Sequence, residues 1–139
     1  MKVSIIYGST TGNTERVAGL IKDQLSDHEV SLVNVADVSD LDYDAELVLL
    51  GSSTWGYGEL QDDFADHFDK LTNSHLGGKK VAVFGCGDKD GFGDVFCEAV
   101  SLLTDKAEEC GASIIKEGLR VDGNVDDNTE AIIAFAKSL

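Results

Sequence analysis

Apolar runs alternate with amphipathic stretches along this sequence, and the runs predict five β-strands. Four of them are rich in Val, Ile and Leu without strict alternation, which is typical of strands that are buried on both faces. We therefore expect a sheet that is covered by helices on both sides. The predicted strands are Lys2–Tyr7, Val30–Val35, Leu47–Gly51, Lys80–Gly85 and Ser113–Val121.

The stretches between these runs carry apolar residues at spacings of three and four, which predicts helices. Strands that alternate with helices indicate an open, mostly parallel, doubly wound α/β sheet with right-handed crossovers. Ligands of such sheets bind beyond the carboxyl ends of the strands, where the strand order reverses. The predicted helices are Asn13–Leu25, Asp62–Leu71, Asp94–Glu109 and Asp127–Leu139.

The turn after the first strand, Gly8–Glu15, is rich in hydrogen-bond donors and opens a helix. Backbone N–H groups and the helix N-terminus favour an anion there. The same residue types are common in ordinary turns and N-caps, but five in six positions exceed what one helix start needs. The turn has no Lys or Arg. It also lacks the Gly-Lys-Ser/Thr ending of a nucleoside-triphosphate P-loop and the Gly-x-Gly-x-x-Gly pattern of a dinucleotide-binding turn. It therefore suits a phosphate monoester that is held intact. The donors are Ser9, Thr10, Thr11, Asn13 and Thr14, with Gly12 among them.

Two further loops, Ser52–Glu59 and Cys86–Asp94, combine glycines with an aromatic residue. Trp55, the only tryptophan, could cover the edge of the core or stack on a flat ligand. Phe92 lies in the neighbouring loop, and both loops should flank the crevice that holds the phosphate turn. A phosphate socket between aromatic walls suggests a flat, phosphorylated aromatic ligand, for which flavin mononucleotide (FMN) is the natural candidate.

Several motifs resemble the flavodoxin family in its short-chain form, as found in sulfate reducers. The resemblance spans the whole sequence and implies a flavodoxin-like fold, with a doubly wound five-stranded parallel sheet in the order 2-1-3-4-5 and helices on both faces. It also implies one FMN-binding domain over residues 1–139. The motifs are Ser9–Glu15, Ser53–Gly56, Glu59–Phe64, Phe84–Asp88, Phe96–Cys97 and Gly118–Gly123.

The resemblance implies a low-potential one-electron carrier that holds FMN non-covalently and shuttles between its semiquinone and hydroquinone. Trp55 would cover one face of the flavin, and Phe92, or alternatively Tyr57, the other. Gly56, with Gly58 as a substitute, would flip its peptide to offer a carbonyl to flavin N5, because glycine tolerates either backbone state. No catalytic or metal-binding residue is expected. The implied FMN-binding residues are Ser9, Thr10, Thr11, Gly12, Asn13, Thr14, Ser53, Thr54, Trp55, Gly56, Tyr57, Gly58, Cys86, Gly87, Asp88, Phe92, Phe96 and Cys97.

Acidic residues outnumber basic ones by 26 to 11, which gives a net charge of −15. This charge disfavours nucleic acid and anionic membranes as partners. We expect Glu59, Asp62, Asp63 and Asp66 to form one helical stripe near the flavin. The stripe would dock basic-surfaced redox proteins through fast, salt-sensitive encounters, and it could equally be a solvated helix face. We expect a monomer.

The three cysteines, Cys86, Cys97 and Cys110, form no Cys-x-x-Cys pair, and we find no signal peptide. A reduced, cytoplasmic protein is therefore expected. An FMN-dependent quinone or NAD(P)H reductase on the same fold remains the main alternative, and a phosphate- or peptide-binding module without a cofactor is another. A signalling receiver domain is excluded, since Gly8-Ser9 and Ser52-Ser53 stand where it needs acidic residues.

Overall fold

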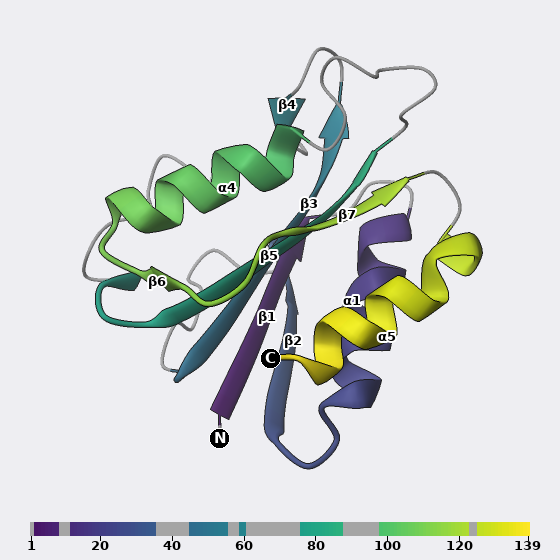
Figure 1. Ribbon diagram of the computed structural model, residues 1–139, viewed down its shortest axis with the longest axis horizontal. Helices are drawn as coiled ribbons and strands as arrows, with labels where there is room; N and C mark the ends of the chain where they lie inside the picture. The colour runs from purple at the N-terminus through teal and green to yellow at the C-terminus, as the bar shows by residue number, and fades with distance from the viewer. Residues whose placement is uncertain are drawn as a thin grey trace.

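The computed structural model describes residues 2–8, 12–35, 45–55, 59–60, 76–87, 98–122 and 125–139, and for 53–55 and 59–60 it describes the backbone alone. Strands and helices alternate along these residues, as the sequence predicts (Figure 1). The strands are β1 (Lys2–Gly8), β2 (Glu29–Asn34), β3 (Leu47–Trp55), β4 (Glu59–Leu60), β5 (Lys80–Gly87), β6 (Ser113–Ile114) and β7 (Leu119–Asp122). The helices are α1 (Asn13–Gln24), α4 (Glu98–Glu109), the short 3₁₀ helix η2 (Val125–Asn128) and α5 (Thr129–Lys137).

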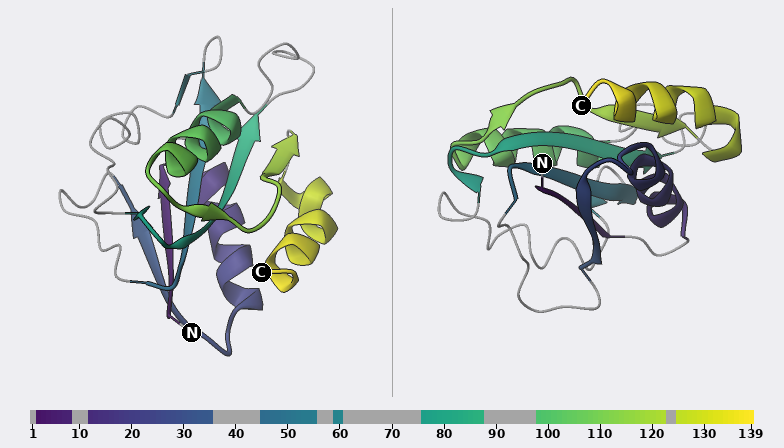
Figure 2. Two further views of the ribbon diagram at one scale, coloured as in Figure 1. Left: turned by 60° about the vertical axis from the view of Figure 1, so that its left-hand side comes forward. Right: turned by 90° about the horizontal axis from the view of Figure 1, so that it is seen from below.

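The strands form one sheet in the order β2-β1-β3-β5, with β6 and β7 both pairing with β5 on its outer side. All these pairs are parallel. Because β5 is the fourth parallel strand and β6 with β7 forms the fifth, the predicted order 2-1-3-4-5 is confirmed. Helices α1 and α5 lie side by side on one face of the sheet, and α4 lies on the other (Figures 1 and 2). The doubly wound fold is thus confirmed.

Successive residues of the central strands point to opposite faces of the sheet, and both faces are buried. In β5, Ala82 and Phe84 pack with α1 and α5, whereas Val81 and Val83 pack with α4. The central strands β1 and β3 divide their apolar residues in the same way. Water reaches neither face, which explains why the sequence shows continuous apolar runs rather than alternation.

The fifth strand is split, contrary to the single predicted strand Ser113–Val121. Val81 pairs with Ile114, and Phe84 pairs with Leu119. An advance of three residues along β5 therefore corresponds to an advance of five residues along the β6–β7 segment. The two extra residues leave the ladder as a bulge. Within the bulge, a Cβ on Gly118 would lie 2.3 Å from Val100 Cγ1 of α4, so only glycine allows this approach.

The start of the last predicted helix also needs correction. α5 begins at Thr129 rather than Asp127, because the preceding residues form η2. The side-chain amide of Asn128 donates a hydrogen bond to the Asp122 carbonyl at 2.9 Å, which ties η2 to the end of β7. The predicted helix Asp62–Leu71, and residues 94–97 of the predicted helix Asp94–Glu109, lie outside the described residues.

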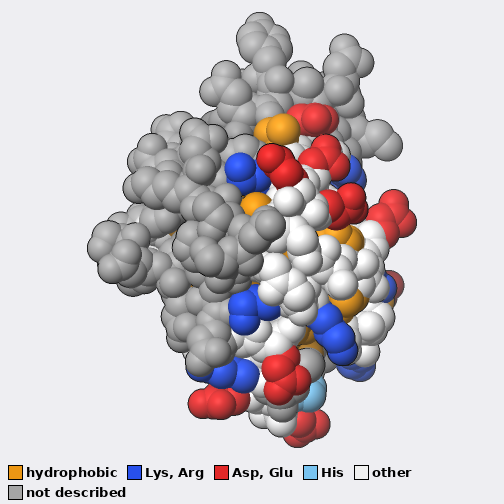
Figure 3. Space-filling view, turned by 90° about the vertical axis from the view of Figure 1, so that its left-hand side faces the viewer, with side chains coloured by type: hydrophobic (Ala, Val, Ile, Leu, Met, Phe, Trp, Pro, Cys, Tyr) orange, Lys and Arg blue, Asp and Glu red, His pale blue; other side chains and the backbone are white. Residues whose placement is uncertain are grey.

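The described surface is mostly polar. Figure 3 shows acidic and basic side chains on one face, with hydrophobic side chains in small separate areas. Ile115, in the bulge, is the only large hydrophobic side chain that is exposed among the described residues, at 40%. In the same part of the chain, no helix has both the length and the apolar character needed to span a membrane.

Candidate functional site

The carboxyl ends of β1, β3 and β5 meet at one edge of the sheet. Gly8 pairs with Ser52, and Ser52 pairs with Gly85, so the ends of all three strands lie next to one another. The chain leaves β1 through α1 to β2 on one side, while β3 and β5 continue on the other. The strand order therefore reverses beside the start of α1, which is where doubly wound sheets bind ligands.

Among the residues that the structure describes, no side chain caps the start of helix α1. Its N-cap, Gly12, has a φ of 92° in the left-handed region, where glycine is favoured. The N–H of Arg16 donates the first helical hydrogen bond to the Gly12 carbonyl at 3.0 Å. The N–H groups of Asn13, Thr14 and Glu15 therefore have no acceptor within the helix. This leaves a positively polarised helix start at the edge where β1 ends.

Thr14 places a buried hydroxyl in the first turn of this helix. Its side chain is fully buried, and among the described residues its Oγ1 has no hydrogen-bond partner. An unsatisfied buried polar group costs about 1–3 kcal/mol. An acceptor that arrives with a ligand would remove this cost. The described residues therefore fit a bound phosphate group. Ser9, Thr10 and Thr11 of the same turn lie outside the described residues.

Cys86 lies near the end of β5, buried on the face that packs against α1. Burial raises the pKa of its thiol to about 11, and the neighbouring Thr14 hydroxyl offsets part of that rise. The approach of these side chains falls short of a regular hydrogen bond, since Thr14 Oγ1 has no partner of acceptable geometry. The thiol is protonated at neutral pH, so it is a poor nucleophile.

Cys86 and Gly87 belong to β5, where the sequence predicted the beginning of a loop. They pair with Val121 and Asp122 of β7, and these pairs extend the strand beyond Gly85. The remaining predicted residues of this loop, Asp88, Phe92, Phe96 and Cys97, lie outside the described residues.

Trp55 is also a strand residue rather than part of a loop. β3 continues past Gly51, because Ser52 and Ser53 pair with Gly85 and Cys86. Thr54 and Trp55 then pair with the antiparallel strand β4, in which Glu59 stands opposite Trp55. Glu59 is therefore not on the helical stripe predicted for it.

The other members of that stripe, Asp62, Asp63 and Asp66, lie outside the described residues, as do Gly56, Tyr57 and Gly58 between β3 and β4. Their predicted roles therefore remain predictions.

Sequence reasoning missed one charged contact beside the site. Arg16, near the start of α1, forms an ion pair and hydrogen bond with Asp126 of η2. This contact joins the start of α1 to the segment that follows β7. No local pattern could have indicated it, since the partners are far apart in the sequence.

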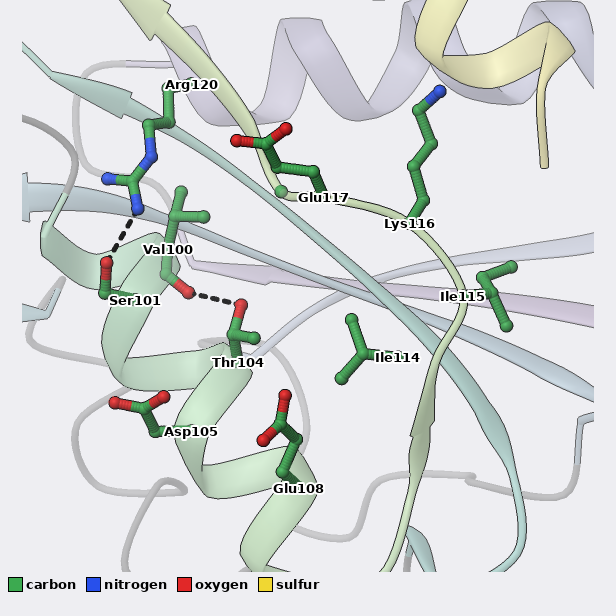
Figure 4. A pocket seen from close by; sticks show the side chains of 11 residues that line it. Val100, Ser101, Thr104, Asp105, Glu108, Ile114, Ile115, Lys116, Glu117 and Arg120 are labelled. Atoms are coloured by element: carbon green, nitrogen blue, oxygen red, sulfur yellow. Dashed lines mark hydrogen bonds between the residues drawn. The ribbon is translucent and has the colours of Figure 1, made fainter.

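A groove of about 460 Å³ lies between α4 and the β6–β7 segment (Figure 4). Arg120 donates a hydrogen bond to Ser101 Oγ at 2.7 Å across it. Lys116 lies over the ring of Phe135, with Nζ 5.8 Å from the ring centroid. The groove follows the side of the sheet rather than the carboxyl ends of its strands, so we do not assign the ligand site to it.

The fold defines the class: a doubly wound α/β protein in which a helix starts where the strand order reverses. Residues 5–135 match the flavodoxin family model. The chain is 44% identical to flavodoxin of Maridesulfovibrio salexigens, over 99% of this chain and 96% of that protein. It is 41% identical to flavodoxin 1 of Escherichia coli over 80% of this chain, but that match spans only 64% of the longer relative. The crystal structure of oxidised flavodoxin 1 from Bacillus cereus superposes with a TM-score of 0.84 and 32% identity, over 98% of this chain and 95% of that one.

The chain therefore belongs to the flavodoxin family. Flavodoxins are FMN-containing electron carriers that serve partner proteins, and they are not enzymes. The near-complete overlap with the relative from Maridesulfovibrio agrees with the short-chain form.

Proposed function

We propose that this protein is a low-potential electron carrier that works between the semiquinone and the hydroquinone of FMN. The observation that carries this proposal is the start of α1. Within the described part of the chain, the helix start has no side-chain cap and the buried Thr14 hydroxyl has no hydrogen-bond partner, and both lie where the strand order reverses. Membership of the flavodoxin family identifies FMN as the cofactor, and the helix start suits the binding of its phosphate.

We assign the phosphate to the turn between β1 and α1. Backbone N–H groups of the first turn and the side chains of Ser9, Thr10, Thr11, Asn13 and Thr14 would hold it. The absence of Lys and Arg from the turn suits a phosphate that is bound and not transferred. Residues 1–139 would form one FMN-binding domain.

We assign the flavin ring to the loops that follow β3 and β5. Trp55 would cover one face, and Phe92 or Tyr57 the other. The pairing of Trp55 with Glu59 supports this assignment, because it fixes the backbone of Trp55 at the carboxyl edge of the sheet. Because the backbone is already fixed, less conformational entropy is lost when the side chain stacks on a ligand. Gly56, directly after β3, remains our candidate for the carbonyl that meets flavin N5.

The charge of the chain supports both the low potential and the choice of partners. A net charge of −15 opposes the addition of further negative charge to a buried flavin, so full reduction requires a strong donor. The same charge would draw basic-surfaced redox proteins to the flavin edge at rates that fall with salt. We propose that the protein acts as a cytoplasmic monomer.

Measurements of FMN binding and of electron transfer together test this function. The apoprotein should take up one equivalent of FMN, and the loaded protein should pass electrons to a basic acceptor such as cytochrome c. It should not oxidise NADH or NADPH by itself. Steady oxidation of either nucleotide by the pure protein would favour the reductase instead. An apoprotein that takes up no FMN would contradict the proposed FMN site.

A further inference from the structure

We propose that Asp126 is a positioning residue for the phosphate site, which acts through Arg16 to hold the first turn of α1. This inference rests on the proposed function, since it presumes that the FMN phosphate binds at that turn. It gives a role to the segment after β7, which lies outside the three loops that the sequence indicates as the flavin site.

The first turn of α1 is the part of the site that needs support. Among the described residues, no side chain caps this helix start, and helix ends without caps open more readily. The N–H of Arg16 donates a hydrogen bond to the Gly12 carbonyl at 3.0 Å, which closes the turn. A contact that fixes Arg16 therefore also fixes the three residues before it, whose N–H groups would face the phosphate.

Such a contact is made by the Arg16 side chain. Its guanidinium forms an ion pair and hydrogen bond with the carboxylate of Asp126 in η2. η2 contacts both α1 and β7, and the last residue of β7, Asp122, pairs with Gly87 at the carboxyl end of β5. The ion pair thus ties the first turn of α1 to a second segment at the carboxyl edge of the sheet.

η2 is itself firmly held, so it can serve as an anchor. Val125 is 1% exposed and belongs to the core cluster beneath α1. The Asn128 amide donates a hydrogen bond to the Asp122 carbonyl at 2.9 Å, and Thr129 Oγ1 donates one to the Asp126 carbonyl at 3.0 Å. Asp126 therefore lies on a fixed turn. A helix start that is fixed in advance loses less conformational entropy when the phosphate binds.

Charge alone would give Asp126 the opposite effect on FMN. A carboxylate near the phosphate repels it, so neutralising Asp126 should strengthen FMN binding if only Coulomb interactions matter. Positioning predicts weaker binding, because Arg16 loses its partner and the first turn loosens. The sign of the change in FMN affinity therefore separates the two explanations.

The test compares FMN with riboflavin, which has the same ring but no phosphate. Dissociation constants are measured at low salt by quenching of flavin fluorescence on wild-type apoprotein and on Asp126→Asn. The substitution should weaken FMN about threefold, within the range of an exposed ion pair, and leave riboflavin unchanged. At 0.5 M salt the difference in FMN affinity should shrink, because salt screens the ion pair in the wild type.

Three further variants separate positioning from charge. Arg16→Gln should weaken FMN at least as much as Asp126→Asn, and the double variant should be no weaker than Arg16→Gln, because the two residues act as a pair. Asp126→Glu keeps a carboxylate and should restore most of the affinity. Asp127→Asn removes the same charge from the neighbouring position of η2 and should not weaken FMN.

Equal losses for FMN and riboflavin in Asp126→Asn would make the ion pair a purely structural contact and overturn the inference. Unchanged or stronger FMN binding in Asp126→Asn, or the same loss in Asp127→Asn, would also overturn it. Both aspartates are exposed, so these substitutions should leave the fold intact. Failure of the proposed function looks different, since wild-type apoprotein would then bind no FMN.

Discussion

The ring of Phe84 lies directly against Gly51 on the neighbouring strand. The two residues are paired in register between β3 and β5, and Phe84 is fully buried. A Cβ on Gly51 would lie 2.2 Å from Phe84 Cζ, far inside van der Waals contact. The absence of a side chain on Gly51 thus makes room for Phe84, the largest fully buried side chain among the described residues.

Replacing Gly51 by alanine should destabilise the protein by about 1–3 kcal/mol, the usual cost of overpacking a core. The strain falls on the centre of the sheet, where the ring cannot move into solvent. Chemical denaturation of the apoprotein measures the change in the free energy of unfolding. Gly19→Ala is the matched control, because space is open around Gly19 in the interior of α1. It should stabilise by about 0.5–1 kcal/mol. Equal stability of Gly51→Ala and wild type would contradict the packing described.

The stability of the apoprotein should fall as the pH rises from 9 to 11. The folded-state pKa of Cys86 is raised from 9.0 to about 11. Its contribution is therefore complete below pH 9 and is lost as the unfolded thiol ionises while the folded one does not. The loss attributable to Cys86 is at most about 2–3 kcal/mol, since one pKa unit corresponds to about 1.4 kcal/mol. Denaturation across this range should show a shallower decline for Cys86→Ala than for wild type or Cys110→Ala. Parallel curves for all three would show that Cys86 does not titrate as described.

Removal of the Arg16–Asp126 ion pair should cost at most about 1 kcal/mol, because both side chains are more than half exposed, at 54% and 59%. Asp126→Asn should lower the free energy of unfolding slightly at low salt, and the difference from wild type should shrink at 0.5 M salt. Asp127→Asn on the same 3₁₀ helix is the control for general loss of negative charge. A salt-independent loss of several kcal/mol would mean that the contact is not an ordinary surface ion pair.

Trp55→Ala should weaken FMN binding roughly tenfold or more, because aromatic stacking on a flat base is worth about 1–3 kcal/mol. Riboflavin affinity should fall in parallel, since the ring and not the phosphate is affected. The potentials of the bound flavin should shift as well. Trp55→Phe should recover most of the affinity. If affinity and potentials are unchanged in Trp55→Ala, then Trp55 is not part of the flavin site.

The sheet could be predicted well from the sequence because its strands are buried on both faces. Continuous apolar runs such as the one in β5 then leave a strong local signal. The ends of β3 and β5 were missed, because Ser52 to Trp55 and Cys86-Gly87 resemble turn residues. They remain in strands because neighbouring strands pair with them. The bulge in the fifth strand depends on the approach of Gly118 to Val100, which is a tertiary contact.

In the candidate site, too, the local motif could be predicted and the contacts between distant segments could not. The turn before α1 is a local motif, and its position between β1 and α1 is as expected. The approach of Thr14 to Cys86 and the pairing of Arg16 with Asp126 join distant segments. Such pairs depend on how the helix is placed over the sheet, which no local residue pattern reveals.

The most direct measurement is an anaerobic reductive titration of the FMN-loaded protein, followed by visible absorption. A one-electron carrier should pass through a stable blue, one-electron-reduced form before it bleaches, and the second electron should require a much lower potential than the first. A yellow protein that bleaches in a single two-electron step would contradict the proposed function.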